Sequence, residues 1–154
     1  MQKKVFEIIP VPKPRQTQRD RFKPSNATLR YRAYADELRL QAGRWTLPES
    51  FAVVFHVPMP KSWSKKKRAE MEGKPMQSRP DLSNLLKALE DALMEKDEMI
   101  YQATAKKLWS VEGKVEVMAI ENVLFQFPDR RKVDQKNIQP KLDRRKRSQK
   151  VIAK

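Results

Sequence analysis

The fold is decided by the stretch Arg79-Pro80-Asp81-Leu82-Ser83-Asn84-Leu85-Leu86-Lys87-Ala88-Leu89-Glu90-Asp91-Ala92-Leu93. This stretch holds a complete helix signal. Asp81 is a preferred N-cap residue, and Pro80 before it favours a chain that enters the helix extended. Apolar side chains then recur at helical spacing and predict a buried stripe, formed by Leu82, Leu85, Leu86, Leu89 and Leu93. The sequence therefore predicts a helix from Asp81 to about Met94 that packs on the core.

The same helix carries a polar face made of Ser83, Lys87, Glu90 and Asp91, since residues three and four apart are neighbours on a helix. Two interpretations are open. A lysine beside carboxylates at a helix start suits chemistry on phosphate. Alternatively, the face is a solvated set of salt bridges on an ordinary amphipathic helix.

The segments around this helix predict a mixed α/β domain, more closely an α+β fold with helices packed on a mixed sheet. Predicted strands cover residues 4–9, 49–57, 99–110 and 114–123, and the last two form a hairpin. A helix is predicted over 27–41, capped by Ser25 or Asn26 and ended by Gly43. Part of its apolar face is supplied by Leu29, Ala33, Leu38 and Leu40, mixed with Tyr31 and Tyr34. A short basic helix, capped by Ser62 or Ser64, ends near Gly73.

Charge composition divides the chain into a domain over residues 1–128 and a basic tail over residues 129–154. The tail contains eleven Lys or Arg against three Asp and has few apolar residues, which predicts disorder and non-specific binding to nucleic acid. The whole chain has 154 residues and a net charge of +15, which favours a polyanionic partner.

Residue types that are rare or missing narrow the candidate sites. The chain has no cysteine, which excludes disulfides and thiolate zinc sites. Its only histidine, His56, lies in an apolar run and is better explained as a strand residue than as a ligand. Any metal site must therefore use oxygen ligands, which suit Mg²⁺ or Mn²⁺. No apolar run approaches the roughly 18 residues of a membrane span, so no membrane partner is expected.

Three basic segments are candidate DNA-binding surfaces. They contribute Lys13, Arg15, Arg19 and Arg21 from a loop, Lys61, Trp63, Lys65, Lys66, Lys67 and Arg68 from the short helix, and Arg79 before the long helix. Trp63 either contacts nucleic acid or packs on the body of the domain, and both hold at once if its ring is buried under a wet basic rim.

The stretch from Arg79 to Leu93 resembles the RusA family of Holliday-junction resolvases, whose pattern there is Asp, an apolar residue, Asp, Asn, then Lys and a later Asp-Ala-Leu. Lys96-Asp97-Glu98-Met99-Ile100 looks like a degraded form of a second family block, and Met59 to Lys67 looks like a family variant. The resemblance covers roughly residues 4–123. It implies a homodimer that cuts four-way DNA junctions with Mg²⁺ or Mn²⁺, encoded by a phage or prophage and acting in the bacterial cytoplasm.

Carried over by position, the resemblance implies three catalytic residues: Asp81, Lys87 and Asp97. The implied metal ligands are Asp81 and Asp97, with Glu98 as the alternative register and Asp91 as a further candidate or a residue that supports the site.

Ser83 stands where the family has a second aspartate, so the site lacks one negative charge. The sequence therefore allows an active enzyme, a weakened one, or a branched-DNA-binding protein on the same fold. A basic RNA- or ribosome-associated protein is permitted by composition alone, but it makes no use of the acidic helix.

Overall fold

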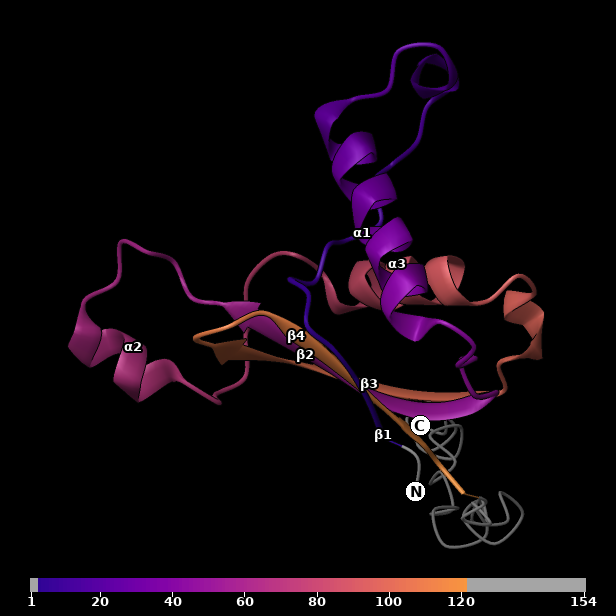
Figure 1. Cartoon of the computed structure of the whole chain (residues 1–154). Helices are drawn as coiled ribbons and strands as arrows, with labels where there is room; N and C mark the ends of the chain where they lie inside the picture. The colour runs from indigo at the N-terminus through magenta and orange to yellow at the C-terminus, as the bar shows by residue number, and fades with distance from the viewer. Residues whose placement is uncertain (1–2, 122–154) are drawn as a thin grey trace, which may run out of the picture. The chain divides into compact units, whose positions relative to one another are not determined.

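A mixed four-stranded sheet forms the centre of the part of the chain that the computed structural model describes, residues 3–121 (Figure 1). Its strands are β1 (Lys3–Phe6), β2 (Ser50–Pro58), β3 (Gln102–Ser110) and β4 (Lys114–Ala119). Their spatial order is β1-β4-β2-β3, with β2 parallel to β3 and antiparallel to β4. This arrangement confirms the predicted mixed α+β fold.

The predicted hairpin between the last two strands is wrong, because β2 lies between them. Val53 of β2 pairs with Ala105 of β3 on one side and with Val117 of β4 on the other. The short connection between β3 and β4 instead passes the end of β2, where the amide of Met59 donates to the carbonyl of Ser110 at 3.0 Å. The physical reason is burial, since the strand richest in Phe and Val gains most from a neighbour on each side.

Two helices, α1 (Asn26–Ala42) and α3 (Leu82–Leu93), cover one face of the sheet, as Figure 1 shows. Helix α1 begins after Ser25, whose Oγ accepts a hydrogen bond from the amide of Thr28, and ends at Gly43 with φ of 58°. That left-handed backbone is one that glycine adopts without strain. Both ends agree with the sequence prediction.

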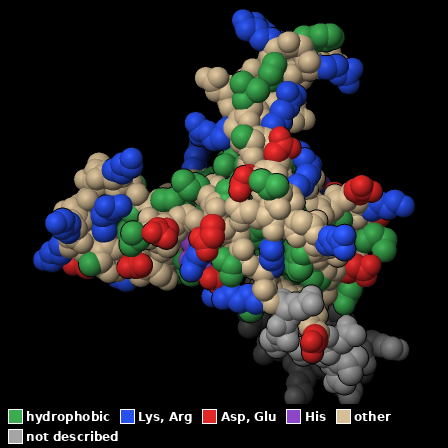
Figure 2. All heavy atoms as spheres, viewed as in Figure 1, with side chains coloured by type: hydrophobic (Ala, Val, Ile, Leu, Met, Phe, Trp, Pro, Cys, Tyr) green, Lys and Arg blue, Asp and Glu red, His purple; other side chains and the backbone are tan. Residues whose placement is uncertain are grey.

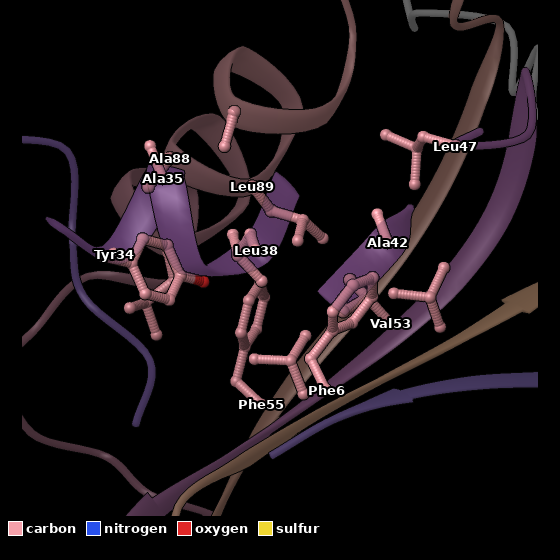
Figure 3. Packing of buried hydrophobic residues seen from close by; sticks show 14 of the residues in the cluster. Phe6, Tyr34, Ala35, Leu38, Ala42, Leu47, Val53, Phe55, Ala88 and Leu89 are labelled. Carbon is pink, nitrogen blue, oxygen red and sulfur yellow. The ribbon is translucent and has the colours of Figure 1, made fainter. Parts of the chain in front are cut away.

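The core between these helices and the sheet confirms the predicted leucine stripe of α3 (Figure 3). Leu85 and Leu89 are fully buried, against Leu38 of α1 and Phe55 of β2 among others, and the other three leucines of the stripe are half-buried at its edge. Burying a leucine is worth roughly 1.5–3 kcal/mol, so the spacing of these residues is what docks α3 on the sheet.

The predicted apolar face of α1 is wrong for three of its four aliphatic residues. Leu29 and Leu40 are 49% and 76% exposed, and Ala33 is exposed as well. The buried face is formed by Thr28, Tyr31, Tyr34, Ala35, Leu38 and Ala42. Leu38, Tyr31 and Tyr34 belong to both sets, and the two tyrosine rings supply the apolar area that the exposed aliphatic side chains do not.

A second, smaller apolar cluster lies beneath α2 (Lys65–Met71), which begins after Ser64. It buries Met59, Met76 and Trp109 with part of Trp63. Two short 3₁₀ helices complete the described elements, η1 (Gln18–Arg21) and η2 (Asp97–Met99). The segment between α2 and α3 runs beside β3, where the amide of Met76 donates to the carbonyl of Lys107.

The predicted domain end at residue 128 and the predicted tail over residues 129–154 lie outside the described residues. Within residues 3–121, no helix is long and apolar enough to cross a membrane.

Candidate active site

Asp81 lies directly before the first turn of α3, at the N-cap position that the sequence predicts. Its carbonyl accepts hydrogen bonds from the amides of Asn84 and Leu85, at 3.1 and 3.2 Å. Its side chain makes no capping hydrogen bond, so the expected side-chain cap is absent. The exposed carboxylate of Asp81 is therefore available for a ligand, at the helix end where backbone amides point outward.

Lys107 of β3 holds the chain that leads into Asp81. Its ammonium group donates to the carbonyls of Ser78 and Pro80, at 2.5 and 2.6 Å. Sequence reasoning missed this residue, because nothing in a strand of alternating residues indicates which distant carbonyls a lysine will reach. The position of Asp81 thus depends on β3 as well as on α3.

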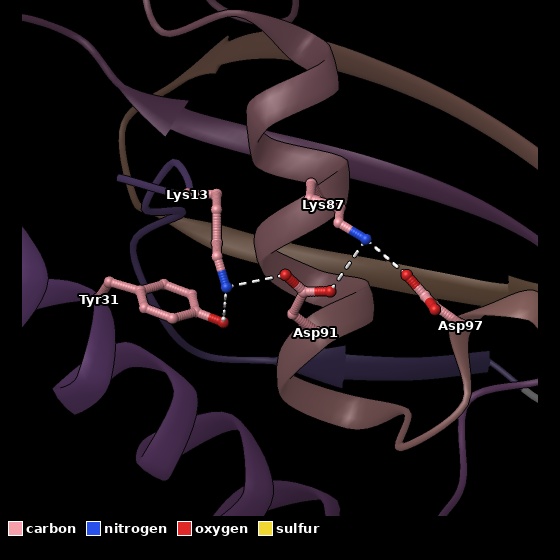
Figure 4. A network of polar contacts seen from close by, with 5 residues as sticks. All are labelled: Lys13, Tyr31, Lys87, Asp91 and Asp97. Carbon is pink, nitrogen blue, oxygen red and sulfur yellow. Dashed lines mark hydrogen bonds and ion pairs between the residues drawn. The ribbon is translucent and has the colours of Figure 1, made fainter. Parts of the chain in front are cut away.

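Lys87 connects α3 to the acidic turn that follows it (Figure 4). Its Nζ lies 2.5 Å from Oδ2 of Asp97 in η2 and 3.2 Å from Oδ1 of Asp91, one helical turn further along α3. The structure therefore brings together two of the three predicted catalytic residues, which are ten positions apart in the sequence.

Asp91 is enclosed by cations. Its second oxygen, Oδ2, lies 2.8 Å from Nζ of Lys13, and that ammonium group also contacts the hydroxyl and the ring of Tyr31 in α1 (Figure 4). The amide of Lys13 donates to the carbonyl of Asn84 as well. Because both carboxylate oxygens contact lysines, Asp91 is suited to joining the N-terminal segment, α1 and α3.

The protonation states follow from these contacts. Hydrogen bonds to Asp97 and Asp91 raise the pKa of Lys87, and the bond from Lys87 lowers the pKa of Asp97. Burial acts to raise the pKa of Asp91, but the two lysines outweigh it and lower that pKa. At neutral pH this part of the site therefore holds an ammonium group between two carboxylates.

The candidate metal ligands are not gathered into one cluster. Among residues 3–121, no group of three or more His, Asp or Glu side chains is close enough to hold a metal ion. Asp97, Glu98 and Ser83 are exposed, and the contact between Lys87 and Asp97 is half-exposed on both sides. Exposed ion pairs are weak, so a divalent cation can compete with Lys87 for Asp97.

Comparison with known protein families gives a match over most of the chain. Residues 7–120 match the family described as Endodeoxyribonuclease RusA. The chain belongs to the RusA family. That family consists of endodeoxyribonucleases that act on Holliday junctions, so the basic surplus has a natural partner in branched DNA. No curated protein matches the chain.

The structure places the predicted DNA-binding segments of this RusA-family chain on different elements. Figure 2 shows Lys and Arg side chains gathered over α2 and at the far end of the segment before α1. Most predicted DNA-binding side chains are exposed, namely Arg15, Arg19, Arg21, Lys61, Lys65, Lys66, Lys67 and Arg79. Lys13 is not among them, since its charge is used at Asp91.

Trp63 has a structural role in this RusA-family chain. Its ring lies 4.9 Å from that of Trp109, and the ammonium of Lys67 lies 4.2 Å from the centre of the Trp63 ring. Arg68, one residue after Lys67, is half-buried. The packing interpretation of Trp63 is therefore confirmed, with a basic rim around the ring.

Proposed function

We propose that this chain is an endodeoxyribonuclease that uses Mg²⁺ or Mn²⁺ to nick four-way DNA junctions, acting as a homodimer in the cytoplasm of a bacterial host. One observation carries the proposal: the contact between Lys87 and Asp97. It joins the helix motif and the acidic turn, the two separate parts of the RusA pattern, at one place on the surface.

The donor chemistry suits a hard divalent cation. Asp81 and Asp97 would hold it, with Glu98 beside them. Mg²⁺ in proteins commonly takes one or two carboxylates and fills its remaining positions with water and phosphate oxygens. When bound, the cation supplies Lewis acidity and lowers the pKa of a coordinated water.

Lys87 would act through its charge rather than as a base. Its raised pKa keeps it protonated at neutral pH, so it has no lone pair with which to accept a proton. A fixed ammonium group stabilises the negative charge that develops on phosphorus oxygens as the phosphodiester is attacked. Asp91 would act as a positioning residue, because its carboxylate contacts the ammonium group of Lys87 and holds it in place.

The test is cleavage of an end-labelled four-way junction on a denaturing gel, with Mg²⁺, Mn²⁺ or EDTA, and with linear duplex as the DNA control. We expect paired symmetric nicks that require metal and that Asp81→Asn abolishes. Asp36→Asn is a matched control, because Asp36 is an exposed residue of α1 whose only described partner is Arg39. Cleavage by Asp81→Asn at the normal rate would remove Asp81 from the mechanism.

Ser83 supports a second candidate, a branched-DNA-binding protein that has lost most of its nuclease activity. A serine hydroxyl brings no charge to the metal site, and the described residues contain no cluster of three carboxylates. Tight junction binding without nicks in any metal would favour this candidate.

A further inference from the structure

Phe22 is the most exposed large hydrophobic residue in the described part of the chain, with 88% of its surface accessible. It directly follows η1, in the segment that precedes α1. Its ring belongs to neither apolar cluster, so it takes no part in packing the described core. An aromatic ring left in water is a candidate contact for a partner.

The loop that carries Phe22 is held in shape by one buried carboxylate. Oδ2 of Asp20 accepts hydrogen bonds from the amide and hydroxyl of Thr17, at 2.7 and 2.9 Å. Oδ1 of Asp20 accepts from the amide of Ser25 and the hydroxyl of Thr28, at 2.9 and 3.3 Å. These bonds tie both ends of the loop to the start of α1. Phe22 is therefore presented by a preorganised loop, which reduces the entropy cost of binding.

The surface around Phe22 is positive. Arg19, Arg21 and Lys23 flank it in sequence, and Arg30 and Arg32 lie on the first turns of α1. None of these five forms an ion pair within residues 3–121, while the nearby Asp20 has both oxygens engaged inside the loop. In Figure 2, hydrophobic and basic side chains lie side by side at this end of the molecule.

Two of these arginines, Arg21 and Arg32, line a hollow at the loop. It has a volume of about 340 Å³ and is lined by Gln16, Thr17, Gln18, Asp20, Arg21 and Arg32. Two arginines line this hollow together with amide and hydroxyl side chains, and these donors suit a phosphate of a nucleic-acid backbone.

An aromatic ring beside unpaired cations fits a nucleic-acid base whose face is accessible. We infer that Phe22 stacks on a base at the branch point of DNA, while Arg19, Arg21 and Arg32 hold the adjacent phosphates. The inference rests on the proposed function for its choice of DNA. Base pairs at a crossover lack continuous stacking on one side, so opening one there costs less than in a duplex.

Trp63, the aromatic residue that the sequence offers for contact with nucleic acid, is less suited to this role. Its ring already contacts Trp109 and Lys67. Stacking a base on it would require the loss of one of those contacts, whereas the ring of Phe22 is accessible as it stands.

The test uses the full chain with Asp81→Asn, in EDTA, and a four-way junction with 2-aminopurine at the crossover. Fluorescence of this base rises when it loses its DNA neighbours, and a ring stacked on it changes the signal again. We expect Phe22→Ala to abolish the protein-dependent change and to weaken junction binding by about 5- to 150-fold, the effect of one stacked base. Phe22→Trp should keep both, and binding to linear duplex should change little.

Leu40→Ala is the matched control, because Leu40 is also an exposed hydrophobic residue, 76% accessible, but lies on α1 away from the loop. The same junction affinity and fluorescence for Phe22→Ala and for its parent would overturn the inference. So would loss of binding to vesicles of phosphatidylserine and phosphatidylcholine with junction binding intact, since Phe22 would then serve a membrane surface. Because these readouts need no cleavage, failure of the proposed nuclease activity would be seen separately in the gel assay.

Discussion

Nζ of Lys87 lies 2.5 Å from Oδ2 of Asp97, across the gap between the middle of α3 and the start of η2. The same ammonium group contacts Asp91, so the lysine is held from two directions. This arrangement fixes a positive charge at the surface without burying it. Substitutions of Lys87 can therefore test its charge and its shape separately.

Lys87→Met should abolish most cleavage while leaving junction binding nearly intact. Removing one preorganised group that stabilises transition-state charge typically lowers kcat by about 10²–10³-fold. Lys87→Arg keeps the charge and should retain part of the rate. Single-turnover cleavage and a gel-shift titration on the same junction measure the two quantities. A large loss of binding with unchanged single-turnover rate at saturation would show that Lys87 is a DNA-binding residue instead.

Ser83→Asp should lower the Mg²⁺ concentration needed for half-maximal cleavage. The substitution adds a carboxylate on the exposed first turn of α3, next to Asp81, and a second negative charge strengthens the binding of a hard cation. If the natural chain is weakly active, the cleavage rate should rise as well. A metal titration of the cleavage rate measures both. Reduced activity in a chain that is already robust would show that its site is complete without that acid.

The ends of α1 and α3 depend on residues that are close in the sequence, and the sequence predicted them. The leucine spacing and Asp81 placed α3 within one residue at each end, and Ser25 and Gly43 placed both ends of α1. The predicted hairpin failed because a short connection shows only that two strands end near each other. It cannot show that β2 enters between them, which depends on burial of the whole sheet.

The same limit applies to the site. Asp81, Lys87 and Asp97 stood out through a family pattern, and the structure places the last two in contact. Lys107 and Phe22 did not stand out. The importance of Lys107 comes from two carbonyls 27 and 29 residues away, and that of Phe22 comes from the lack of any packing partner, which only a folded structure reveals.

Lys107→Met should reduce cleavage through a misplaced Asp81, with no direct role in chemistry. The methionine keeps much of the side-chain volume but leaves two carbonyls without their charged donor, which costs about 1–3 kcal/mol of stability. We expect a raised Mg²⁺ requirement and faster amide exchange over residues 78–82. Lys106→Met is the control, because the adjacent Lys106 is exposed and belongs to the other face of β3. Equal Mg²⁺ requirements for the two variants would rule out a positioning role.

Leu38 and Leu40 test the corrected face of α1, since they lie two residues apart and are 0% and 76% exposed. Leu38→Ala should destabilise the domain by about 2–5 kcal/mol, because it leaves a cavity against Phe55 and Leu89 in the core. Leu40→Ala should change stability by no more than about 0.5 kcal/mol. Urea unfolding followed by far-UV circular dichroism measures both. Similar losses for the two variants would mean that Leu40 is covered in solution.

Asp20 should make the loop before α1 sensitive to acid. Hydrogen bonds from the amides of Thr17 and Ser25 lower its pKa well below the usual 3.8. A carboxylate with a lowered pKa stabilises the folded loop fully above the unfolded pKa, and this stabilisation is lost as the pH falls below about 4. We therefore expect exchange protection of those two amides at pH 7 to decline progressively between about pH 4 and pH 2, after correction for intrinsic exchange rates.

Asp20→Asn isolates this effect from the titration of other carboxylates. The variant should show weaker protection of the Thr17 and Ser25 amides at pH 7, because a neutral amide oxygen is a poorer acceptor than a carboxylate. The difference between the two proteins should then shrink as the pH falls below about 4, toward the lowered pKa of Asp20 in the folded loop. A difference that stays constant from pH 7 to pH 2 would show that the shape of residue 20, and not its charge, holds the loop that presents Phe22.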